Sequence, residues 1–342
     1  MTRAIGMQRI VWALLVAGSL SFPLASCGTG GPPQRVVIPA GASFRDAADT
    51  LARRGIVRFP RAFRAYASFT RRDRSIRAGT YEFRGTQGWN DLLDALAGGR
   101  GLVHTFTIPE GYAISDIRTV IAKSLGVPAE SVDVAARDTA LRRRLDVPTP
   151  TLEGYLFPDT YTFPPGATAR EAVITMVERF EQVWKDEWDA PVRAMAMSRH
   201  DIVSLAAIIE KEARLSEERP VISAVYHNRL KIRMPLQADP TVQYALGRHV
   251  DRVMFKDLEI DSRYNTYKYP GLPPGPIASP GAASLEAAVY PAQVPFLFFV
   301  AHPDGHHEFR RTFREHSAAI RQMKRARKAL DTARATPGRT PR

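Results

Sequence analysis

The most informative stretch of this 342-residue sequence is Asp201-Ile-Val-Ser-Leu-Ala-Ala-Ile-Ile-Glu-Lys-Glu-Ala, residues 201–213. Its apolar residues recur at helical spacing, and aspartate is a residue type that commonly caps the first turn of a helix, so we expect Asp201 to be the N-cap. At about 3.6 residues per turn, one stripe would face the core. That stripe contains Ile202, Leu205, Ala206, Ile209 and Ala213.

Two glutamates, Glu210 and Glu212, lie on opposite flanks of this stripe. Glu212 sits between the bulky neighbours Leu205 and Ile208, so it is better placed than Glu210 for partial desolvation. Desolvation disfavours the carboxylate and raises the pKa, as a general acid working near neutral pH requires. The alternative is that both glutamates are solvated residues at the edge of the helix. Periodicity alone leaves both interpretations open.

The composition is that of an ordinary globular protein. Hydrophobic residues make up 44% and charged residues 24% of the chain, which argues against wholesale disorder and against a multi-span membrane protein. The net charge of +13 raises the question of nucleic-acid binding. No basic run is interleaved with aromatic residues, however, and part of the excess lies in residues 310–342, which we predict to be a solvated helix and a frayed tail. We therefore expect no nucleic-acid partner, and an anionic cell wall or membrane surface suits the charge better.

The first residues indicate export from the cytoplasm. Arg3 and Arg9 precede an apolar stretch, residues 10–24, which matches the charged and apolar regions of an export signal and is marginal as a membrane span. It runs into Leu24-Ala-Ser-Cys27-Gly, which resembles the lipobox at which bacterial lipoproteins are cleaved and acylated. Cys27 is the only cysteine, so it cannot form an intramolecular disulfide and is a lipidation candidate. An uncleaved single-pass anchor helix is the alternative, and both place the remainder outside the cytoplasm.

The pattern of elements predicts an α+β fold in which a small domain precedes a helix-rich one. Residues 1–33 would be the signal or anchor and a linker, and residues 34–104 an α+β domain that resembles the sugar-binding LysM type. Residues 105–325 would form a mixed, helix-rich domain that includes a helix from Ala169 to about Trp188 and strand-like runs at 296–301 and 309–313. Residues 326–342 would be a basic tail.

Several blocks, in order, resemble the endolytic murein transglycosylases of the MltG (YceG-like) family. The match runs from about residue 36 to residue 325 and includes Ile209-Glu-Lys-Glu-Ala and Tyr264-Asn-Thr-Tyr. The other blocks are Thr107-Ile-Pro-Glu-Gly-Tyr, Leu152-Glu-Gly-Tyr-Leu-Phe-Pro-Asp-Thr-Tyr, Val225-Tyr-His-Asn-Arg-Leu, Pro235-Leu-Gln-Ala-Asp-Pro-Thr-Val and Gly271-Leu-Pro-Pro-Gly-Pro-Ile-Ala-Ser-Pro-Gly. The resemblance implies that residues 105–325 are a lytic transglycosylase catalytic domain.

The resemblance implies cleavage of the bond between N-acetylmuramic acid and N-acetylglucosamine inside nascent peptidoglycan strands, leaving 1,6-anhydro ends. It implies that Glu212 is the catalytic residue, with Glu210 as the alternative or a supporting group. Many family members have threonine or serine after the catalytic glutamate, where this chain has Ala213. One carboxyl group suffices if the nucleophile is the sugar's own C6 hydroxyl, whereas ordinary glycosidases need two.

A loop at residues 152–166 adds candidates for substrate binding. Tyr155, Phe157 and Tyr161 lie beside Glu153 and Asp159, and aromatic rings with carboxylates suit a glycan groove. The alternative is a proline-bounded loop packed on its own aromatic residues. Further candidates for hydrogen bonds to N-acetyl and lactyl groups have structural turn-making as their alternative, above all Asn265. They are Asn228, Arg229, Gln237, Asp239, Tyr264, Asn265 and Tyr267.

A cluster of histidines, His302, His306 and His307 near Asp304, raises the question of a metal. It lies in a turn between two strand-like runs with no supporting carboxylate pair or cysteine, so we expect neither a metal nor a cofactor. The resemblance implies a periplasmic catalytic domain held at the inner membrane, with glycan strands as substrate and peptidoglycan synthases as partners. A non-catalytic glycan-binding scaffold and a true hydrolase that makes reducing ends are the other hypotheses.

Overall fold

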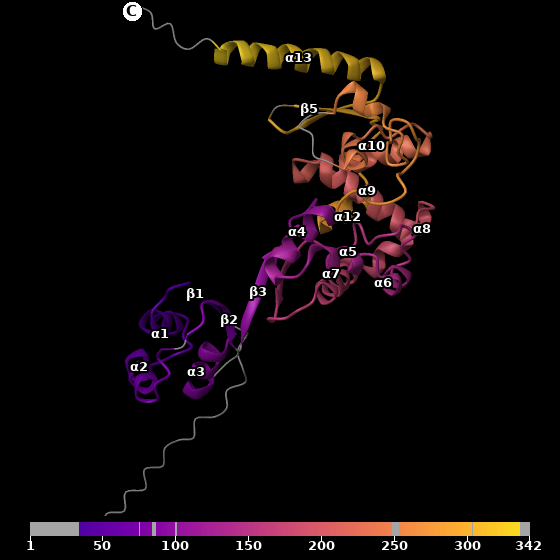
Figure 1. The fold of residues 1–342 in the computed structure, drawn as a ribbon. Coiled ribbons are helices and arrows are strands. Elements are labelled where there is room, and N and C mark those ends of the chain that lie inside the picture. The colour runs from indigo at the N-terminus through magenta and orange to yellow at the C-terminus, as the bar shows by residue number, and fades with distance from the viewer. Residues whose placement is uncertain are drawn as a thin grey trace, which may run out of the picture. The chain divides into compact units, whose positions relative to one another are not determined.

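The structure, a computed structural model, describes residues 34–74, 76–83, 87–99, 101–247, 253–302 and 304–335 (Figure 1). The apolar stretch at residues 10–24 and Cys27 lie outside these ranges. The chain divides into two compact units, residues 1–100 and residues 101–342. Both mix helices with short strands, and the predicted α+β class is confirmed.

The first unit is small, and its described residues form two strands and three helices. Strands β1 and β2 pair antiparallel, with Gln34 opposite Phe83 and Ile38 opposite Gly79. Ser43 caps the first helix and forms the expected reciprocal capping box with Asp46. The elements are β1 (Gln34–Ile38), α1 (Phe44–Arg53), α2 (Pro60–Phe69), β2 (Gly79–Phe83) and α3 (Trp89–Gly98).

The second unit is rich in helices. Strands β3 and β4 pair antiparallel, as do β5 and β6, with Phe298 opposite Arg310 and Ala301 opposite His307. Its N-terminal half contains β3 (Leu102–Thr107), α4 (Ile114–Leu125), α5 (Ala129–Ala135), α6 (Thr139–Arg144), β4 (Thr160–Phe163), α7 (Ala169–Val183), η1 (Asp186–Trp188) and α8 (Asp189–Ala194). The rest contains α9 (Arg199–Glu212), η2 (Ser216–Glu218), α10 (Arg219–Lys231), α11 (Asp239–Leu246), η3 (Phe255–Glu259), α12 (Ala282–Val289), β5 (Phe298–Ala301), β6 (His307–Arg310) and α13 (Phe313–Ala335).

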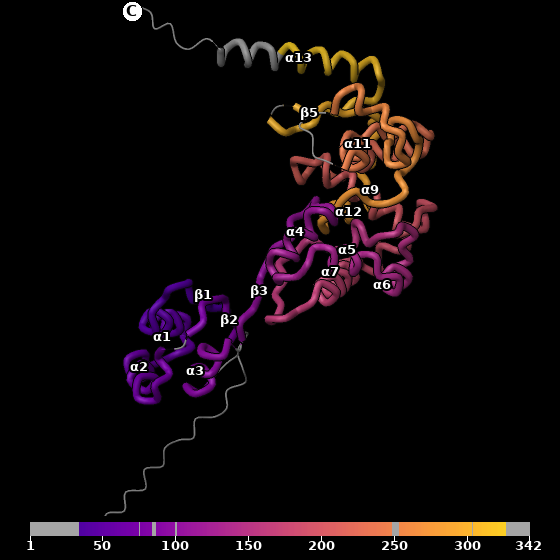
Figure 2. Tube along the Cα trace, viewed as in Figure 1, coloured from indigo at the N-terminus to yellow at the C-terminus, as the bar shows by residue number. Residues whose placement is uncertain are grey.

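Helix α9 is the centre of this unit, and Figure 2 shows α11 and α12 beside it. Every residue from Ile202 to Ile209 is buried, which is more than the single apolar stripe that periodicity predicts. The reason is that α8, α10, α11 and α12 all pack against α9, so no face of its middle turns meets water. The small residues Ser204, Ala206 and Ala207 allow the neighbours to approach.

Three predicted boundaries are wrong. The strand-like run at 309–313 is in fact the end of β6, which spans His307–Arg310, and the start of α13 at Phe313. Asp201 is not the N-cap of α9: Ser198 is, and Asp201 closes the capping box from the third helical position. Helix α7 ends at Val183 instead of near Trp188, because Trp184 leaves the helical conformation. The turn that follows sets the Trp184 and Trp188 rings edge to face, 5.3 Å apart, and buries both.

The C-terminal helix α13 packs on the β5–β6 pair through His316, whose ring lies 5.1 Å from that of Phe298. The α13 helix is long, but among the described residues no helix has both the length and the apolarity that crossing a bilayer requires.

Gly154 offers a test of how the 152–166 loop is held against α9. Its φ is +83°, and a Cβ there would lie 2.3 Å from Pro276 Cβ and 3.1 Å from Val203 Cγ1. Gly166 has the same φ of +83°, but a Cβ there would meet no atom within 4 Å, so this position isolates the backbone strain. We expect Gly166→Ala to reduce the free energy of unfolding by about 1 kcal/mol. Gly154→Ala should reduce it by about 3 kcal/mol because overpacking adds to the strain. Denaturant unfolding of both variants checks this, and equal losses would contradict the close approach.

Candidate active site

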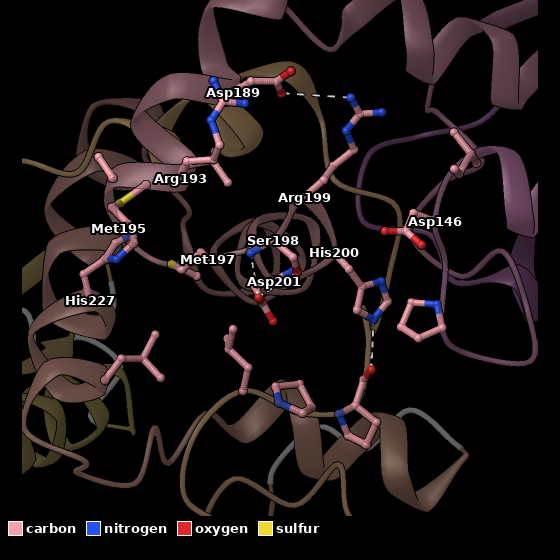
Figure 3. A pocket seen from close by; sticks show the side chains of 18 of the residues that line it. Asp146, Asp189, Arg193, Met195, Met197, Ser198, Arg199, His200, Asp201 and His227 are labelled. Carbon is pink, nitrogen blue, oxygen red and sulfur yellow. Dashed lines mark hydrogen bonds and ion pairs between the residues drawn. The ribbon is translucent and has the colours of Figure 1, made fainter.

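A cavity with a volume of about 1490 Å³ lies at the N-terminal end of α9 (Figure 3). Its polar groups are engaged in holding the fold. Asp201 accepts from the Ser198 backbone, and Arg199 lies 4.0 Å from Asp189. His200 is bonded through both ring nitrogens, to Pro274 O and to the Tyr155 hydroxyl, each at 2.9 Å. Because a carbonyl only accepts, Nε2 carries the proton and the ring is committed to structure.

The opposite end of α9 carries Glu212, its last residue. Helix α10 supplies Tyr226, which is buried and donates its hydroxyl proton to Glu212 Oε1 at 3.2 Å. The same face of α10, three residues on, carries Arg229, whose guanidinium is buried and donates to Leu236 O at 2.5 Å and to Leu297 O at 2.7 Å. Arg229 therefore fixes the surrounding loops and places a positive charge near the carboxyl group.

The pKa of Glu212 is raised to about 7. Burial is the main cause, and the negative charge of Asp239 acts in the same direction. The Tyr226 hydrogen bond and the charge of Arg229 lower the pKa but do not outweigh burial. The C-terminal end of a helix carries a partial negative charge, which also disfavours a carboxylate. Glu212 is half-buried, so an incoming group can reach a carboxyl that is partly protonated at neutral pH.

Asp239, the first residue of α11, is the second acidic group beside Glu212. It is exposed, and its Oδ1 accepts the hydroxyl proton of Tyr267 at 2.5 Å. Burial together with the Asp239 charge raises the pKa of Tyr267, so this phenol stays protonated and remains a donor. The site therefore brings together Glu212, Tyr226, Arg229, Asp239 and Tyr267.

Glu210 is not the solvated flank residue that periodicity allows. Its side chain is 8% exposed and lies 3.4 Å from the Arg219 guanidinium, which is 11% exposed. Its other oxygen accepts from Ser284 Oγ at 2.7 Å and from the Gly281 backbone at 3.1 Å. These partners come from α10 and from the start of α12, so Glu210 joins three helices. Its carboxylate is fully occupied by structural contacts, unlike that of Glu212.

The 152–166 loop is packed on its own aromatic residues, and the expectation that Tyr155 stacks on sugar is wrong. Tyr155 is 0% exposed, with its ring 5.0 Å from that of Phe180. Tyr161 is buried and donates to Phe157 O. Asp159 accepts from Arg179 Nε at 2.7 Å on the adjacent α7. The aromatic content of this loop therefore serves the core. Glu153 is also buried, but it lines a smaller cavity beside α4 and α11.

The remaining candidates divide between structural roles and the rim of the site. Asn228 donates to Val294 O and Phe296 O, and Asn265 donates to Leu258 O and Ile260 O, so turn-making accounts for both amides. Tyr264 packs on Tyr244 with ring centroids 4.8 Å apart. Gln237 is exposed next to Asp239, with a backbone φ of +50°. A bulky residue with positive φ is strained, and such strain commonly accompanies functional sites.

Each histidine of the cluster faces its own carboxylate, and the rings of His302 and His306 stack with centroids 4.3 Å apart. His302 faces Glu308 at 2.9 Å and His306 faces Asp304 at 2.6 Å. The third, His307, is buried and bonds to Glu218 at 2.6 Å, which ties β6 to the turn before α10.

Sequence reasoning missed the residues that define the environments of the two glutamates. Tyr226, Arg219 and Ser284 drew no attention as single residues, although Tyr226 lies within a block that carries the family resemblance. The available signal was spacing: Tyr226 and Arg229 lie three apart and share one face of a helix that the sequence pattern did not predict.

Residues 36–322 match the YceG-like family. A relative from Bacillus subtilis (strain 168), named endolytic murein transglycosylase, is 34% identical over 297 residues, and the match covers 82% of each chain. A relative of the same name from Streptococcus pneumoniae serotype 2 (strain D39) is 28% identical, with 78% of this chain and 54% of the relative covered. A crystal structure of a YceG-like protein from Listeria monocytogenes has a TM-score of 0.62 at 32% identity and covers 84% of this chain and 98% of that chain.

The buried helix α9 ends in a carboxylic acid of raised pKa, which makes Glu212 a candidate general acid in this α+β protein. The chain belongs to the YceG-like family.

The electrostatic origin of the Glu212 pKa is testable without any assay of activity. In Asp239→Asn the negative charge is lost, so the Glu212 carboxyl should titrate at lower pH than in the wild type. Asp261→Asn is the matched control, because Asp261 is an exposed carboxylate that accepts from the Tyr269 hydroxyl in the same way and does not act on Glu212. Carbon-13 NMR of labelled glutamate carboxyls gives the midpoint. An unchanged midpoint in Asp239→Asn would contradict the arrangement.

Proposed function

We propose that this chain is a peptidoglycan lytic transglycosylase that cuts glycan strands internally, with Glu212 as general acid and then general base. The observation that carries the proposal is a half-buried carboxyl group of pKa about 7 at the end of a buried helix. A relative that is 34% identical over 297 residues is named endolytic murein transglycosylase, which supports the substrate class. The scaffold hypothesis gives no reason to keep an acid of raised pKa at this position.

In the first step protonated Glu212 gives its proton to the glycosidic oxygen between N-acetylmuramic acid and N-acetylglucosamine. The bond from that oxygen to the anomeric carbon breaks, and positive charge develops on the muramic acid ring. The hydrogen bond that the Tyr226 hydroxyl donates to Glu212, at the observed separation of 3.2 Å, then stabilises the carboxylate. The negative charge of Asp239 lies on the same side of the protein and stabilises the positive ring.

In the second step the C6 hydroxyl of the muramic acid attacks the anomeric carbon while the Glu212 carboxylate removes its proton. The products are a 1,6-anhydro end and a released N-acetylglucosamine end, with no water consumed. Glu212 is again protonated and ready for the next cut. A pKa near 7 suits both roles, because the group is a usable acid and a usable base at the same pH.

Hydrolysis is the second candidate, and Asp239 is the observation that favours it. A hydrolase needs a second carboxylate to activate water, and Asp239 is an exposed carboxylate near Glu212. One oxygen of Asp239 is already committed to Tyr267, which argues for a charge-stabilising role instead. Mass analysis of the products separates the two reactions, because an anhydro end is lighter by one water than a reducing end.

The substitution Glu212→Gln is the decisive test of the proposal. Glutamine keeps the size of the side chain and its hydrogen bond from Tyr226 but can neither donate nor accept the transferred proton. We expect strand cleavage on isolated sacculi to fall by about two to four powers of ten. The control is Glu217→Gln, an exposed glutamate five residues further on, which should retain near-normal activity. Near-normal release of anhydro-ended fragments by a folded Glu212→Gln protein would refute the assignment.

The substitution Glu210→Gln tests the alternative assignment, in which Glu210 and not Glu212 is the catalytic residue. Because Glu210 pairs with Arg219 and Ser284, we expect this variant to lose stability by about 3 kcal/mol, as when one partner of a buried ion pair is removed. Folded Glu210→Gln protein should still cleave strands. A fully stable Glu210→Gln protein without activity would instead move the catalytic role to Glu210.

We further propose that the catalytic unit works in the periplasm, held at the inner membrane by the N-terminus, and limits strand length beside peptidoglycan synthases. If Cys27 is the lipidation site, metabolic labelling with a fatty-acid probe should tag the wild type, while Cys27→Ala should remain unlabelled and retain its signal segment. Unlabelled wild type would favour the uncleaved anchor helix, and equal labelling of both proteins would exclude Cys27 as the acylated residue.

A further inference from the structure

A second cavity adjoins the Glu212 site along two of its elements. It has a volume of about 570 Å³, and α4, α9, α11 and the residues before Gly154 line it. Helix α9 contributes Lys211, the residue before Glu212, to the wall of the cavity. Helix α11 contributes residues from Pro240 onward, and Pro240 directly follows Asp239. Its lining also includes Ile114, Glu153, Gln243, Tyr244 and Ile277.

The walls of the cavity continue those of the Glu212 site. Tyr267 bonds to Asp239 at the start of α11, and Tyr264 packs on Tyr244 five residues further along the same helix. A rise of about 1.5 Å per residue separates Asp239 from Tyr244 by roughly 7.5 Å along the axis. Helix α11 therefore carries both Asp239 of the carboxyl pair and a wall of the cavity, and the loop with Tyr264 and Tyr267 packs along it.

Glu153 forms the polar floor of this cavity. It is 5% exposed, and its carboxyl group accepts from the Ile114 backbone at 3.0 Å and from the Tyr244 hydroxyl at 3.3 Å. Burial raises its pKa to about 7. A carboxyl group that is partly protonated at neutral pH can both donate to a carbonyl oxygen and accept from a hydroxyl or an amide.

The charged groups around the rim are matched within the protein. Arg118 pairs with Asp133 at 2.9 Å. Lys211 Nζ donates to Gly111 O at 3.3 Å, and Asp116 accepts from the Ala113 backbone at 3.2 Å. A ligand rich in carboxylates would find these cations already engaged. The half-buried ring of Tyr244 suits one face of a sugar ring instead, and the buried Ile114 and Ile277 line the cavity beside it.

We propose that this cavity is a subsite for a neutral N-acetylated sugar of the strand, beyond the bond that Glu212 cleaves. The inference rests on the proposed function for the identity of the strand. The acetamide group supplies one acceptor and one donor, which Glu153 and Tyr244 complement, and the pyranose face packs on the Tyr244 ring. Binding here draws the strand along α11 and sets the scissile bond at Glu212.

The test is a titration of the full chain with N,N′,N″-triacetylchitotriose, a neutral oligomer without lactyl groups or peptide. Isoleucine δ1-methyl NMR signals of Ile114 and Ile277 report on this cavity and not on other sugar-binding surfaces. We expect both signals to shift on titration. Gln243→Trp, which places an indole in the cavity, should weaken the binding reported by these methyls at least tenfold. Arg193→Trp, which places an indole in the larger cavity at the other end of α9, should leave it unchanged.

Ser115→Trp, an exposed position on the α4 wall, replaces Gln243→Trp if that variant does not fold. Methyl signals that stay in place at saturating sugar, or equal affinity in the filled variant, would overturn the subsite. Shifts produced by a free stem peptide but not by the sugar would overturn the neutral-sugar assignment. Failure of the proposed function looks different: the methyls respond to the sugar, but the wild-type protein releases no fragments from sacculi.

Discussion

The complete burial of α9 is the constraint on which the rest of the second unit depends. A helix whose residues from Ile202 to Ile209 all lie inside the core needs neighbours on every side, and α8, α10, α11 and α12 supply them. Burying its C-terminal turn is costly, because carboxylates there lose water and face the negative end of the helix. The fold meets this cost for Glu210 with Arg219, Ser284 and the Gly281 backbone. It leaves Glu212 with a single hydroxyl donor.

This difference assigns distinct tasks to two glutamates that are two residues apart on one helix. Glu210 is ion-paired and doubly hydrogen-bonded, so its negative charge is stabilised where it lies and its role is to hold α9, α10 and α12 together. Glu212 has one neutral donor, a nearby negative charge and a more distant guanidinium. These surroundings favour the protonated form of its carboxyl group. This contrast is an example of a general rule: neighbouring titratable groups take different roles when their surroundings favour different protonation states. Stability and chemistry are thus separated within one helical turn.

The sequence predicts local elements well and their surroundings poorly, for physical reasons. The predicted helix from Ala169 begins where expected, because Thr168 and Glu171 form a capping box, which is a local signal. The end of α7 depends on Trp184 packing on Trp188, which no periodic pattern encodes. The environment of Glu210 depends on Ser284, 74 residues away in sequence. Likewise, a loop rich in tyrosine has the same composition whether it faces sugar or the core, and only the contact of Tyr155 with His200 decides the matter. Side-chain environments that depend on contacts distant in sequence therefore cannot be predicted from local patterns. The choice of Glu212 over Glu210 was possible because it used the bulky neighbours of Glu212 in the helix and the family resemblance.

In the proposed mechanism, the position of Asp239 explains how one carboxyl group can serve as acid and then as base. Before cleavage a proton on Glu212 keeps two like charges from facing each other, which is the reason the Asp239 charge raises the Glu212 pKa. Donating that proton creates the second charge, and the positive ring that forms at the same moment offsets the repulsion. As the ring is neutralised by the C6 oxygen, the repulsion returns and favours removal of the hydroxyl proton by Glu212. Tyr267 holds the Asp239 carboxylate in place throughout, because its hydroxyl remains a donor in both steps. In the proposed mechanism the fixed charge of Asp239 therefore opposes the first proton transfer until the positive ring forms, and it favours the second.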